Sequence, residues 1–401
     1  MKHLKTIFWG LKTLFGVILA GISTAAWGQT PQQEMPVVDP MDSVEISLLT
    51  CQPHDEVYSL YGHTAIRFRD SRKEKMIDAA FNYGVFDFKK SMFVLRFVFG
   101  LTDYELGAYP YKYFVQEYRK FGCLVTEQVL NLTSDEKQKL QDALSENLRP
   151  ENKIYRYNYF YNNCTTKARD IIEQCINGKV EYADNKDDAP SYRDMVHEMT
   201  RNNPWSRFGN DILLGIKADK PTTQREQEFL PHHLMHDFDY AQIYTNGQYR
   251  PLIKERRIAV PAGVQIVESG FPLSPMTCAL ILLAVGLVLF LIEWKNRQAF
   301  VVWDVLLMIA AGTIGIVLTM MLFSQHPTVS LNLQIILFNP LPWFFLWPVI
   351  RGRKTCYWMI TAILCLLFLI GALFQSYAEG IWGLALCLLF QSIIHLYRVR
   401  Q

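Results

Sequence analysis

Charge is scarce in the last third of the chain and balanced over the whole of it. The 401 residues carry 40 Lys and Arg against 38 Asp and Glu, which gives a formal net charge of +2. A near-neutral chain lacks the basic surplus that nucleic acid attracts, so we expect no nucleic-acid partner. We also find no internal repeat and no low-complexity tract. The shortage of charge from Pro275 onward predicts a membrane domain instead.

The apolar segments after Pro275 predict five transmembrane helices, each long enough or nearly long enough to cross a bilayer. The third is the weakest, because Asn339, Pro340 and Pro342 interrupt it. The segments are Met276–Trp294, Phe300–Phe323, Leu331–Ile350, Cys356–Phe374 and Gly380–Tyr397. Residues 275–401 are therefore predicted to form an all-α, five-helix transmembrane domain.

Lysine and arginine are absent from two of the loops between these segments, 324–329 and 375–379. The basic residues gather at the other loops and at the C-terminal end, and they are Lys295, Arg297, Arg351, Arg353, Lys354, Arg398 and Arg400. Because cytoplasmic loops collect Lys and Arg, this distribution places the C-terminus in the cytoplasm. Residues 30–270 then form a domain on the outer side, which we interpret as the periplasmic side of a bacterial inner membrane.

Cysteine is missing from the N-terminal segment, whose pattern is that of a targeting signal. Three lysines precede an apolar stretch at 14–22, and small residues around Ala26 suit cleavage. We interpret residues 1–28 as a signal peptide or an uncleaved N-terminal anchor, and either leaves the topology unchanged. Without a cysteine near the exit, the chain is not expected to be a lipoprotein itself.

The outer domain mixes strands and helices along the chain, which favours an α+β fold. Residues 183–250 are polar and are predicted to be rich in loops. Strands are expected at Val44–Cys51, Gly62–Arg69, Lys75–Tyr83, Val125–Leu132 and Tyr155–Tyr161, and helices at Ser134–Asn147 and Cys164–Asn177.

Cys164 is the most informative of the four cysteines in the outer domain. An aromatic segment, Tyr155–Tyr161, leads into Asn162 and Asn163, and either asparagine can cap the helix that Cys164 begins. The unpaired N–H groups and the dipole of a helix N-terminus favour a thiolate. Cys164 is therefore a candidate nucleophile, and the competing interpretation is a buried, inert thiol.

A cysteine nucleophile needs a base and a group that orients the base. His63 is the best base, because it stands near the start of a predicted strand. If that strand and the next form a hairpin, His63 lies opposite the region of Phe81 and Asn82, and the Asn82 amide could accept a hydrogen bond from the imidazole. Asp78 is the alternative orienting group. The competing interpretation makes His63 a structural residue, as it does Cys164.

Two patterns that could indicate a metal centre are incomplete. His232 and His236 have the i, i+4 spacing that can place two ligands on one helix face, but Pro231 marks a helix start or a loop. The general-base glutamate of the zinc-peptidase motif is also missing. Cys51 and His54 have no second pair of ligands. We therefore expect no metal and no other cofactor.

A group of polar residues lies at the outer end of the third membrane segment: His326, Asn332, Gln334 and Asn339. Asn332 and Asn339 are seven residues apart and would share a helix face. Polar side chains at this depth are costly unless they face one another or a cavity. They are candidate contacts for lipid headgroups or an acceptor substrate, with interhelical hydrogen bonding as an equal alternative.

Several motifs of the chain belong together. They are Tyr61–Arg67, Phe81–Gly84, Asn162–Thr165, Phe229–Pro231, His326–Pro327 with Asn332, and Asn339–Pro340. Over nearly the whole chain they resemble the Lnb-type lipoprotein N-acyltransferases. The order of histidine before cysteine is also similar to circularly permuted NlpC/P60-type papain-like thiol enzymes, including relatives of lecithin:retinol acyltransferase. The resemblance implies a papain-like periplasmic domain followed by a membrane domain.

The resemblance also implies a thiol acyltransferase with two membrane substrates. Cys164 would take an acyl chain from a phospholipid as a thioester, with His63 as the base, and pass it to the α-amine of a lipoprotein's diacylglyceryl-cysteine. Two other functions stay open, a papain-like amidase or peptidase acting on cell-wall peptides and a non-enzymatic membrane-tethered protein that binds lipoproteins or lipids. A five-span base favours the lipid-using enzyme, because a hydrolase of soluble substrates needs no such base.

Overall fold

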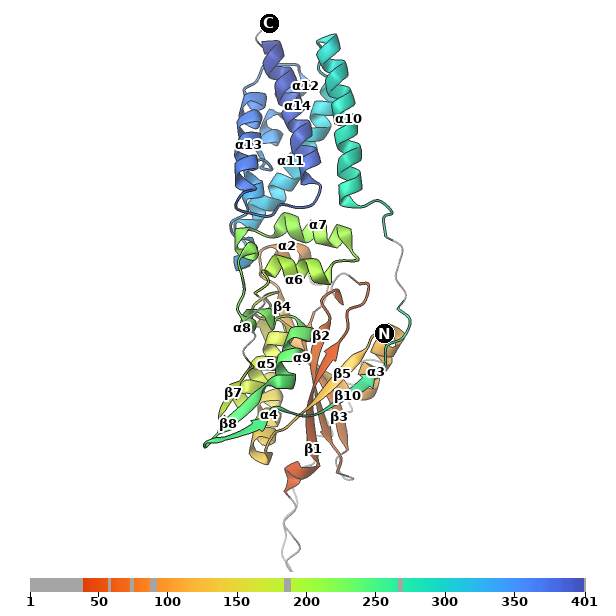
Figure 1. Cartoon of the computed structure of the whole chain (residues 1–401), viewed down its shortest axis with the longest axis vertical. Coiled ribbons are helices and arrows are strands. Elements are labelled where there is room, and N and C mark those ends of the chain that lie inside the picture. Colours follow the sequence, from red (N-terminus) through yellow and green to blue (C-terminus); the bar gives the residue numbers. More distant parts are fainter. Residues whose placement is uncertain are drawn as a thin grey trace, which may run out of the picture. The chain divides into compact units, whose positions relative to one another are not determined.

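The computed structural model of the chain describes residues 39–56, 59–72, 76–86, 92–183, 189–265 and 270–399. The targeting segment predicted at residues 1–28 lies outside these ranges. Pro40–Gln401 make up one compact unit. In that unit an N-terminal α/β domain is followed by a helical membrane domain (Figure 1).

Within the described residues, a seven-stranded antiparallel sheet forms the centre of the first domain. In spatial order its strands are β10 (Ile253–Val260), β5 (Val125–Leu130), β1 (Val44–Cys51), β2 (His63–Asp70), β3 (Ile77–Val85), β4 (Asp103–Pro110) and β6 (Ile154–Arg156). A smaller sheet contains β7 (Lys179–Glu181), β8 (Gln242–Thr245) and β9 (Gln248–Pro251). In the interior strand β1, every residue except Glu45 is buried, as expected for a sheet covered on both faces.

Helices cover the two faces of the large sheet, and alternate residues of β1 show which helices lie on which face. Ile46 and Leu48 enter the core that includes α4 (Ser134–Asn147), α5 (Cys164–Cys175) and α9 (Pro231–Tyr240). Leu49 and Cys51 point to the other face and pack with α3 (Tyr111–Lys120). The helix that begins at Cys164 therefore rests directly on the centre of the sheet.

The segment 183–250 is helical in large part, so its prediction as a loop-rich region is wrong. It contains α6 (Tyr192–Met199), α7 (Pro204–Leu213), η3 (Ile216–Asp219), α8 (Gln224–Gln227) and the helix α9. Its start signals are local: a capping box at Ser191 and Asp194, and a proline in the first turn of α7 and of α9. Together with α2 (Phe93–Val98), α6 and α7 lie between the large sheet and the membrane helices (Figure 1).

The strand predicted at 155–161 is also mostly wrong. β6 ends at Arg156, and the Asn158 side chain then accepts hydrogen bonds from the backbone N–H groups of Phe160 and Tyr161, both at 3.3 Å. An asparagine that bonds the backbone two and three residues ahead stabilises a turn in competition with strand pairing. The aromatic residues of this segment therefore sit on a turn before α5 rather than along a sheet.

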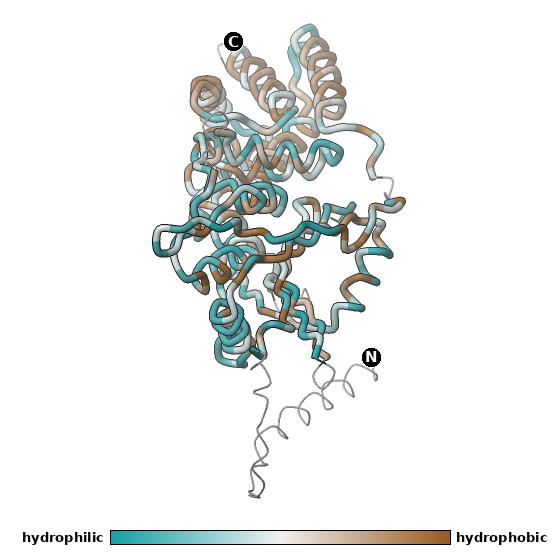
Figure 2. The backbone as a smooth tube through the Cα atoms, turned by 60° about the horizontal axis from the view of Figure 1, so that its bottom comes forward, coloured by the Kyte–Doolittle hydropathy of each residue, from teal (hydrophilic) through white to brown (hydrophobic). Residues whose placement is uncertain are grey.

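The membrane domain begins at α10, and the hydropathy colouring of its helices is mainly brown (Figure 2). Its helices are α10 (Pro275–Asn296), α11 (Val301–Met321), η4 (Pro327–Val329), η5 (Leu333–Ile336), α12 (Leu341–Ile350), α13 (Tyr357–Gly371) and α14 (Ile381–Val399). Among the described residues, three segments are long and apolar enough to cross a membrane: Pro275–Asn296, Val301–Met321 and Leu333–Ile350. Two shorter apolar helices, α13 and α14, follow.

The third membrane segment is not one continuous helix, and it is interrupted near the polar residues singled out in the sequence. Asn332 caps the short η5, and Asn339 lies in the turn between η5 and α12. The two asparagines therefore do not share a helix face as predicted, because the short 3-10 helix η5 and the turn after it lie between them.

Candidate active site

Cys164 is the first residue of α5, and the cap of this helix also fixes the position of the thiol. Of the two candidate asparagines, Asn163 is the cap: its side-chain oxygen accepts hydrogen bonds from the backbone N–H groups of Thr165 and Thr166, both at 2.9 Å. The Thr166 hydroxyl accepts in return from the Asn163 N–H at 2.9 Å. The Asn163 amide nitrogen donates to the Phe229 carbonyl at 2.8 Å, which ties the start of α5 to the loop before α9.

His63 is the first residue of β2, and its imidazole interacts with both Cys164 and Asn82. The ring nitrogen Nε2 lies 3.0 Å from Asn82 Oδ1. Because an amide oxygen can only accept, Nε2 carries the hydrogen and Nδ1 is left for the thiol. The buried Asn82 side chain is itself held by a 3.2 Å hydrogen bond from its nitrogen to the Ala80 carbonyl.

The hairpin register differs from the predicted one. Ile66, and not His63, lies opposite Phe81. Continued toward His63, this register puts Asn82 at a diagonal position on the same face of the sheet, within reach of the imidazole. Asp78 lies further along the hairpin and forms a 2.7 Å ion pair with an arginine of β2. The structure therefore brings Asn82, and not Asp78, to His63.

The surroundings of Cys164 make its thiol acidic. Burial alone would raise the pKa, but the charge of His63, a hydrogen bond from His63, the backbone N–H of Thr64 and the Thr165 hydroxyl together lower the pKa to about 7. Burial also works against the charged form of His63, yet the thiolate and Asn82 raise the pKa of the imidazole above its ordinary value. The two shifts favour a thiolate–imidazolium pair near neutral pH.

The other cysteines of the α/β domain have the opposite character. All eight cysteines of the chain are free thiols. Burial raises the pKa of Cys51, Cys123 and Cys175, so these three stay protonated at neutral pH. Cys164 is thus the candidate nucleophile among the cysteines of this domain.

The pKa of Cys164 leads to a pH-dependent prediction. A lowered pKa means that the thiolate forms at lower pH, so the rate of alkylation of Cys164 by iodoacetamide should rise through a midpoint of about 7 and then level off. The measurement is peptide mass spectrometry of the full-length protein after timed labelling. In His63→Ala the midpoint should move to 9 or higher, because burial remains and the compensating charge is gone. A wild-type midpoint above 9 would contradict the pairing.

A cavity of about 690 Å³ opens beside the thiol. Cys164, His63 and Asn82 form part of its wall, and Glu117 is its acidic residue. The rest of the wall is strongly aromatic and includes Tyr61, Phe86, Phe97, Tyr104, Tyr109, Tyr118, Phe121, Tyr157, Tyr159 and Phe229. Such a cavity suits an apolar ligand with a few polar groups at its reacting end.

Two elements of the cavity wall are attached to the membrane domain. α2 contributes Phe97, and the loop after it is held by a 3.0 Å hydrogen bond from the Gln325 N–H to the Phe99 carbonyl. His326, a predicted substrate contact, approaches the Phe97 carbonyl at 3.3 Å. α7 contributes Ser206, Gly209 and Asn210 to the wall, and it too is bonded to the membrane domain.

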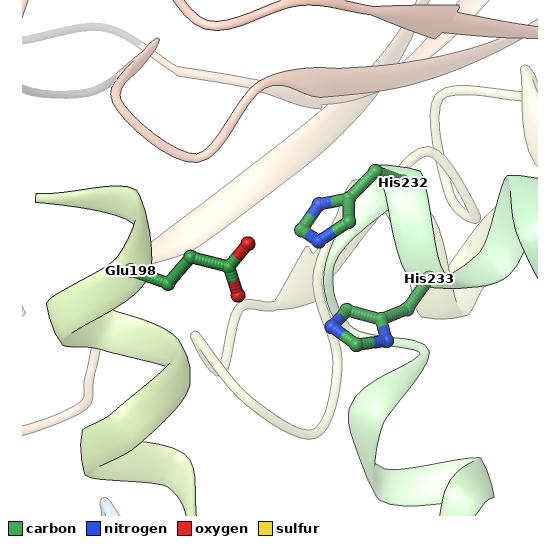
Figure 3. Close-up of side chains that lie close together, drawn as sticks. All are labelled: Glu198, His232 and His233. Atoms are coloured by element: carbon green, nitrogen blue, oxygen red, sulfur yellow. The ribbon is translucent and has the colours of Figure 1, made fainter. Parts of the chain in front are cut away.

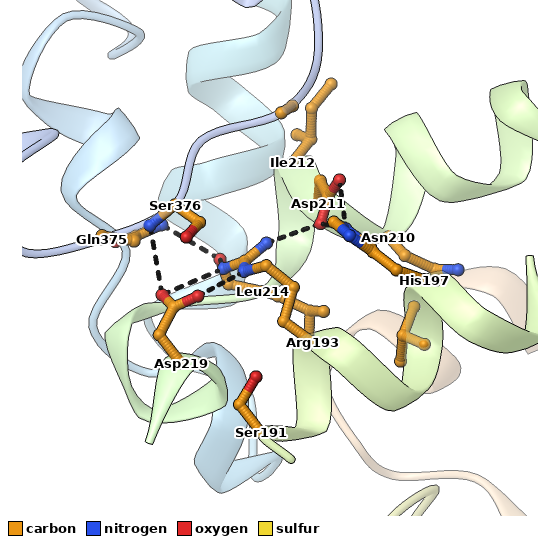
Figure 4. A network of polar contacts seen from close by, with 12 residues as sticks. Ser191, Arg193, His197, Asn210, Asp211, Ile212, Leu214, Asp219, Gln375 and Ser376 are labelled. Carbon is orange, nitrogen blue, oxygen red and sulfur yellow. Dashed lines mark hydrogen bonds and ion pairs between the residues drawn. The ribbon is translucent and has the colours of Figure 1, made fainter. Parts of the chain in front are cut away.

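A buried polar network holds the C-terminal end of α7 (Figure 4). Arg193 of α6 donates hydrogen bonds to Asp211 at 2.7 Å, to Asp219 at 2.6 Å and to the Leu214 carbonyl at 3.1 Å. Both Arg193 and Asp211 are 2 % exposed. His197 completes the network with a 2.9 Å contact to Asp211.

The membrane side of this network consists of the predicted polar residues and one more glutamine. Asn332 donates to the Ile212 carbonyl at 2.6 Å, and Gln334 donates to the Asp211 carbonyl at 2.9 Å. Gln375 donates to the Asn332 side chain at 2.9 Å. These contacts support the hydrogen-bonding alternative for Asn332 and Gln334. Asn339 instead stabilises the turn before α12, where its side-chain oxygen accepts a 3.0 Å hydrogen bond from the Leu341 N–H.

The two incomplete histidine patterns do not come together in the described part of the chain. His236 packs its ring on Tyr240, with centroids 5.1 Å apart, and does not join His232. His232 lies beside His233 instead, with centroids 4.4 Å apart. His54 stacks on an aromatic ring rather than completing a ligand set with Cys51.

Comparison with known proteins identifies the family of the chain. Residues 38–208 match the Lnb N-terminal periplasmic domain, and residues 266–401 match the Lnb transmembrane domain. The chain belongs to the Lnb family. No curated protein and no solved structure matches it. The first Lnb match contains His63, Asn82 and Cys164, so the candidate active site lies in the periplasmic domain of a membrane protein, as the resemblance implied.

Proposed function

We propose that this Lnb-family protein is a lipoprotein N-acyltransferase. It moves an acyl chain from a membrane phospholipid, through a thioester on Cys164, to the α-amine of the diacylglyceryl-cysteine of a lipoprotein. The observation that carries the proposal is a Cys164–His63 pair beside an aromatic cavity whose walls α2 and α7 are bonded to the membrane domain. An enzyme that acts on soluble peptides needs neither the apolar cavity nor the membrane attachment.

The first half-reaction forms the thioester. The Cys164 thiolate attacks the ester carbonyl of the phospholipid, and the tetrahedral intermediate collapses with loss of the lysophospholipid alkoxide. The His63 imidazolium gives its proton to that alkoxide, so the leaving group departs as an alcohol and the histidine becomes neutral.

The second half-reaction uses the same two side chains. The neutral α-amine of the lipoprotein attacks the thioester carbonyl, and His63 takes the proton that the new C–N bond makes acidic. The intermediate then releases the Cys164 thiolate and leaves an amide. The thiolate–imidazolium pair is restored, and no cofactor is required.

The first turn of α5 also offers a donor for the oxyanion of both intermediates. The Asn163 cap uses the N–H groups of Thr165 and Thr166, which leaves the N–H of Cys164 itself as the candidate donor. Its place in the helix N-terminus adds favourable electrostatics for the developing negative charge.

We also propose a fold for the α/β domain and a topology for the membrane domain. The α/β domain is assigned a permuted papain-like fold, because a histidine on a strand precedes a cysteine at a helix start. The apolar segments in α10 to α14 are assigned five crossings of the bacterial inner membrane, the third made by η5 and α12 together. The basic loops support a cytoplasmic C-terminus and a periplasmic α/β domain.

Mass spectrometry of lipoprotein N-termini tests the function. In cells that lack the protein, the lipoproteins should keep a free α-amine, and wild-type protein should restore the N-acyl group. Purified protein in vesicles should move an isotope-labelled acyl chain from a phospholipid to a diacylated lipopeptide. An unaltered acylation state in both experiments would rule the function out, and accumulation of uncut cell-wall peptides would favour the amidase alternative.

Asn82 is assigned as the positioning residue for His63. Asn82→Ala should lower the rate of acyl transfer about 10²-fold, because the imidazole loses the hydrogen bond that fixes its orientation. It should also raise the alkylation midpoint of Cys164, because the imidazolium that lowers the thiol pKa is less stable. Asn82→Asp keeps a hydrogen-bond acceptor for the imidazole, so the alkylation midpoint of Cys164 should stay close to the wild-type value. Asp78→Ala, which leaves the His63 contact intact, should leave the midpoint unchanged.

A further inference from the structure

Three side chains that acyl transfer does not use converge between α6 and α9. Glu198 reaches across from α6, and His232 and His233 extend from the first turn of α9 (Figure 3). One donor atom of each lies within 4.8 Å of the other two. The two histidines fall between the segments that match the Lnb family, whereas Glu198 lies inside the first.

We propose that Glu198, His232 and His233 bind a divalent transition-metal ion of the Zn²⁺ class. Two imidazoles and one carboxylate form a ligand set that zinc accepts, with a fourth position left for water. Ligand bonds of about 2.0–2.2 Å put neighbouring donor atoms roughly 3.3–3.6 Å apart in a tetrahedral site. The three donor atoms lie within 4.8 Å of one another, so the side chains would have to rotate by up to about 1.5 Å toward a bound ion.

The three groups do not satisfy one another. Within the described residues, no hydrogen bond joins Glu198 to either histidine, and His233 Nε2 is a buried ring nitrogen with no hydrogen-bond partner. A buried polar atom left in this way costs about 1–3 kcal/mol. A bound cation would remove this cost if it took up the nitrogen lone pair.

The protonation state of the histidines suits a metal rather than an ion pair. Burial lowers the pKa of His232, against the opposing effect of Glu198. Burial and the neighbouring charges of His232 and His236 lower the pKa of His233 to about 4. Both rings are therefore neutral at neutral pH, as metal ligands must be. The gap offers a cation two imidazole nitrogens and the oxygens of one acidic side chain as donors.

The position of the site indicates what the ion would do. His232 directly follows Pro231, which lines the cavity and packs near Gly62, the residue before His63. α6 carries Arg193, which holds α7, another part of the cavity wall. An ion between α6 and α9 would therefore connect two parts of the cavity wall: Pro231 at the start of α9, and α7, which α6 holds in place. Its role is structural, and the proposal is independent of the acyl-transfer function.

Metal uptake by the full-length protein in detergent tests the site. After chelation and dialysis against Zn²⁺, wild-type protein should hold one ion per chain by elemental analysis, and Co²⁺ should give a visible absorption band. His232→Ala and His233→Ala should each weaken Zn²⁺ binding at least about 100-fold, because even partners of metal ligands contribute 10–100-fold. His236→Ala, a neighbour on the same helix, should bind as wild type does.

Glu198→Gln keeps the test decisive if a histidine variant fails to fold, because Glu198 is exposed and the substitution preserves its shape. Zn²⁺ should raise the Tm of the wild type and of His236→Ala, and should leave the Tm of Glu198→Gln nearly unchanged. Absence of stoichiometric Zn²⁺ in the wild type would overturn the proposal. Uptake that Glu198→Gln retains in full, or that His236→Ala loses, would overturn it too.

Discussion

Cys164→Ser is expected to reduce acyl transfer at least about 10³-fold while leaving the fold intact. The surroundings that bring the thiol pKa to about 7 cannot ionise an alcohol, whose intrinsic pKa is far higher. Stability should change little, because the helix is capped by the Asn163 side chain and not by Cys164. The measurement is transfer of a labelled acyl chain to a diacylated lipopeptide in vesicles, with Tm as the check on folding.

A matched control lies at the other end of the same helix. Cys175→Ser changes a buried cysteine with a raised pKa, so it should lower Tm slightly and leave acyl transfer within a few-fold of wild type. With donor lipid alone, wild-type protein should accumulate an acyl group on the peptide that contains Cys164, and hydroxylamine should release it. Cys164→Ser that keeps a tenth of the activity or more would show that another group is the nucleophile.

The elements that the sequence predicted best are those whose signals are local. β1 has the predicted bounds, Val44–Cys51, and α4 has the predicted bounds, Ser134–Asn147. The start of α4 is a capping box formed by Thr133 and Glu136, two residues that lie three apart in the chain. The start of α5 is equally local, which is why Cys164 could be placed at a helix N-terminus.

The predictions that differ from the structure mostly concern features that depend on distant parts of the chain. Strand pairing in the His63 hairpin was predicted out of register, and the contact to Asn82 exists because a diagonal neighbour is also within reach. Tyrosines alternating over 155–161 resemble a strand, but Asn158 turns the chain there. The helix α6 is not predicted, although its capping box could have marked it, and Pro231 left open whether α9 is a helix or a loop.

The residues of the candidate site could be predicted from the sequence, but the packing of helices around the cavity could not. The order of His63 and Cys164, and the amide of Asn82, follow from residue types and predicted elements. The attachment of α7 to the membrane domain cannot be predicted in this way, because Arg193 and Asp211 look like ordinary surface charges in the sequence. Their burial depends on residues more than a hundred positions later, Asn332, Gln334 and Gln375.

Arg193→Met is expected to destabilise the protein by about 3–5 kcal/mol. Arg193 and Asp211 each have 3 % of the side chain exposed, and Asp219 has 18 %. Removal of the guanidinium leaves two carboxylates with little access to water, and it also removes the donor to the Leu214 carbonyl. The measurement is thermal or denaturant unfolding of the full-length protein in detergent.

A surface ion pair gives the contrast. Arg256 has 51 % of its side chain exposed and pairs with Asp239 at 2.8 Å, so Arg256→Met should cost no more than about 1 kcal/mol. In the Arg193→Met background, Asp211→Asn should recover part of the lost stability, because it removes the more deeply buried of the two uncompensated charges. Equal effects of Arg193→Met and Arg256→Met would show that the buried network contributes little.

The same substitution separates stability from function. Arg193 lies outside the cavity, but it holds the end of α7, whose Ser206, Gly209 and Asn210 form the cavity wall. Protein that stays folded after Arg193→Met should therefore keep the alkylation midpoint of Cys164 near 7, since His63 and Asn82 are untouched, and should lose acyl transfer through weaker binding of the lipid. A raised KM for phospholipid with an unchanged thiol pKa would place the lipid site under α7. A raised thiol pKa would instead mean that the network reaches the catalytic pair itself.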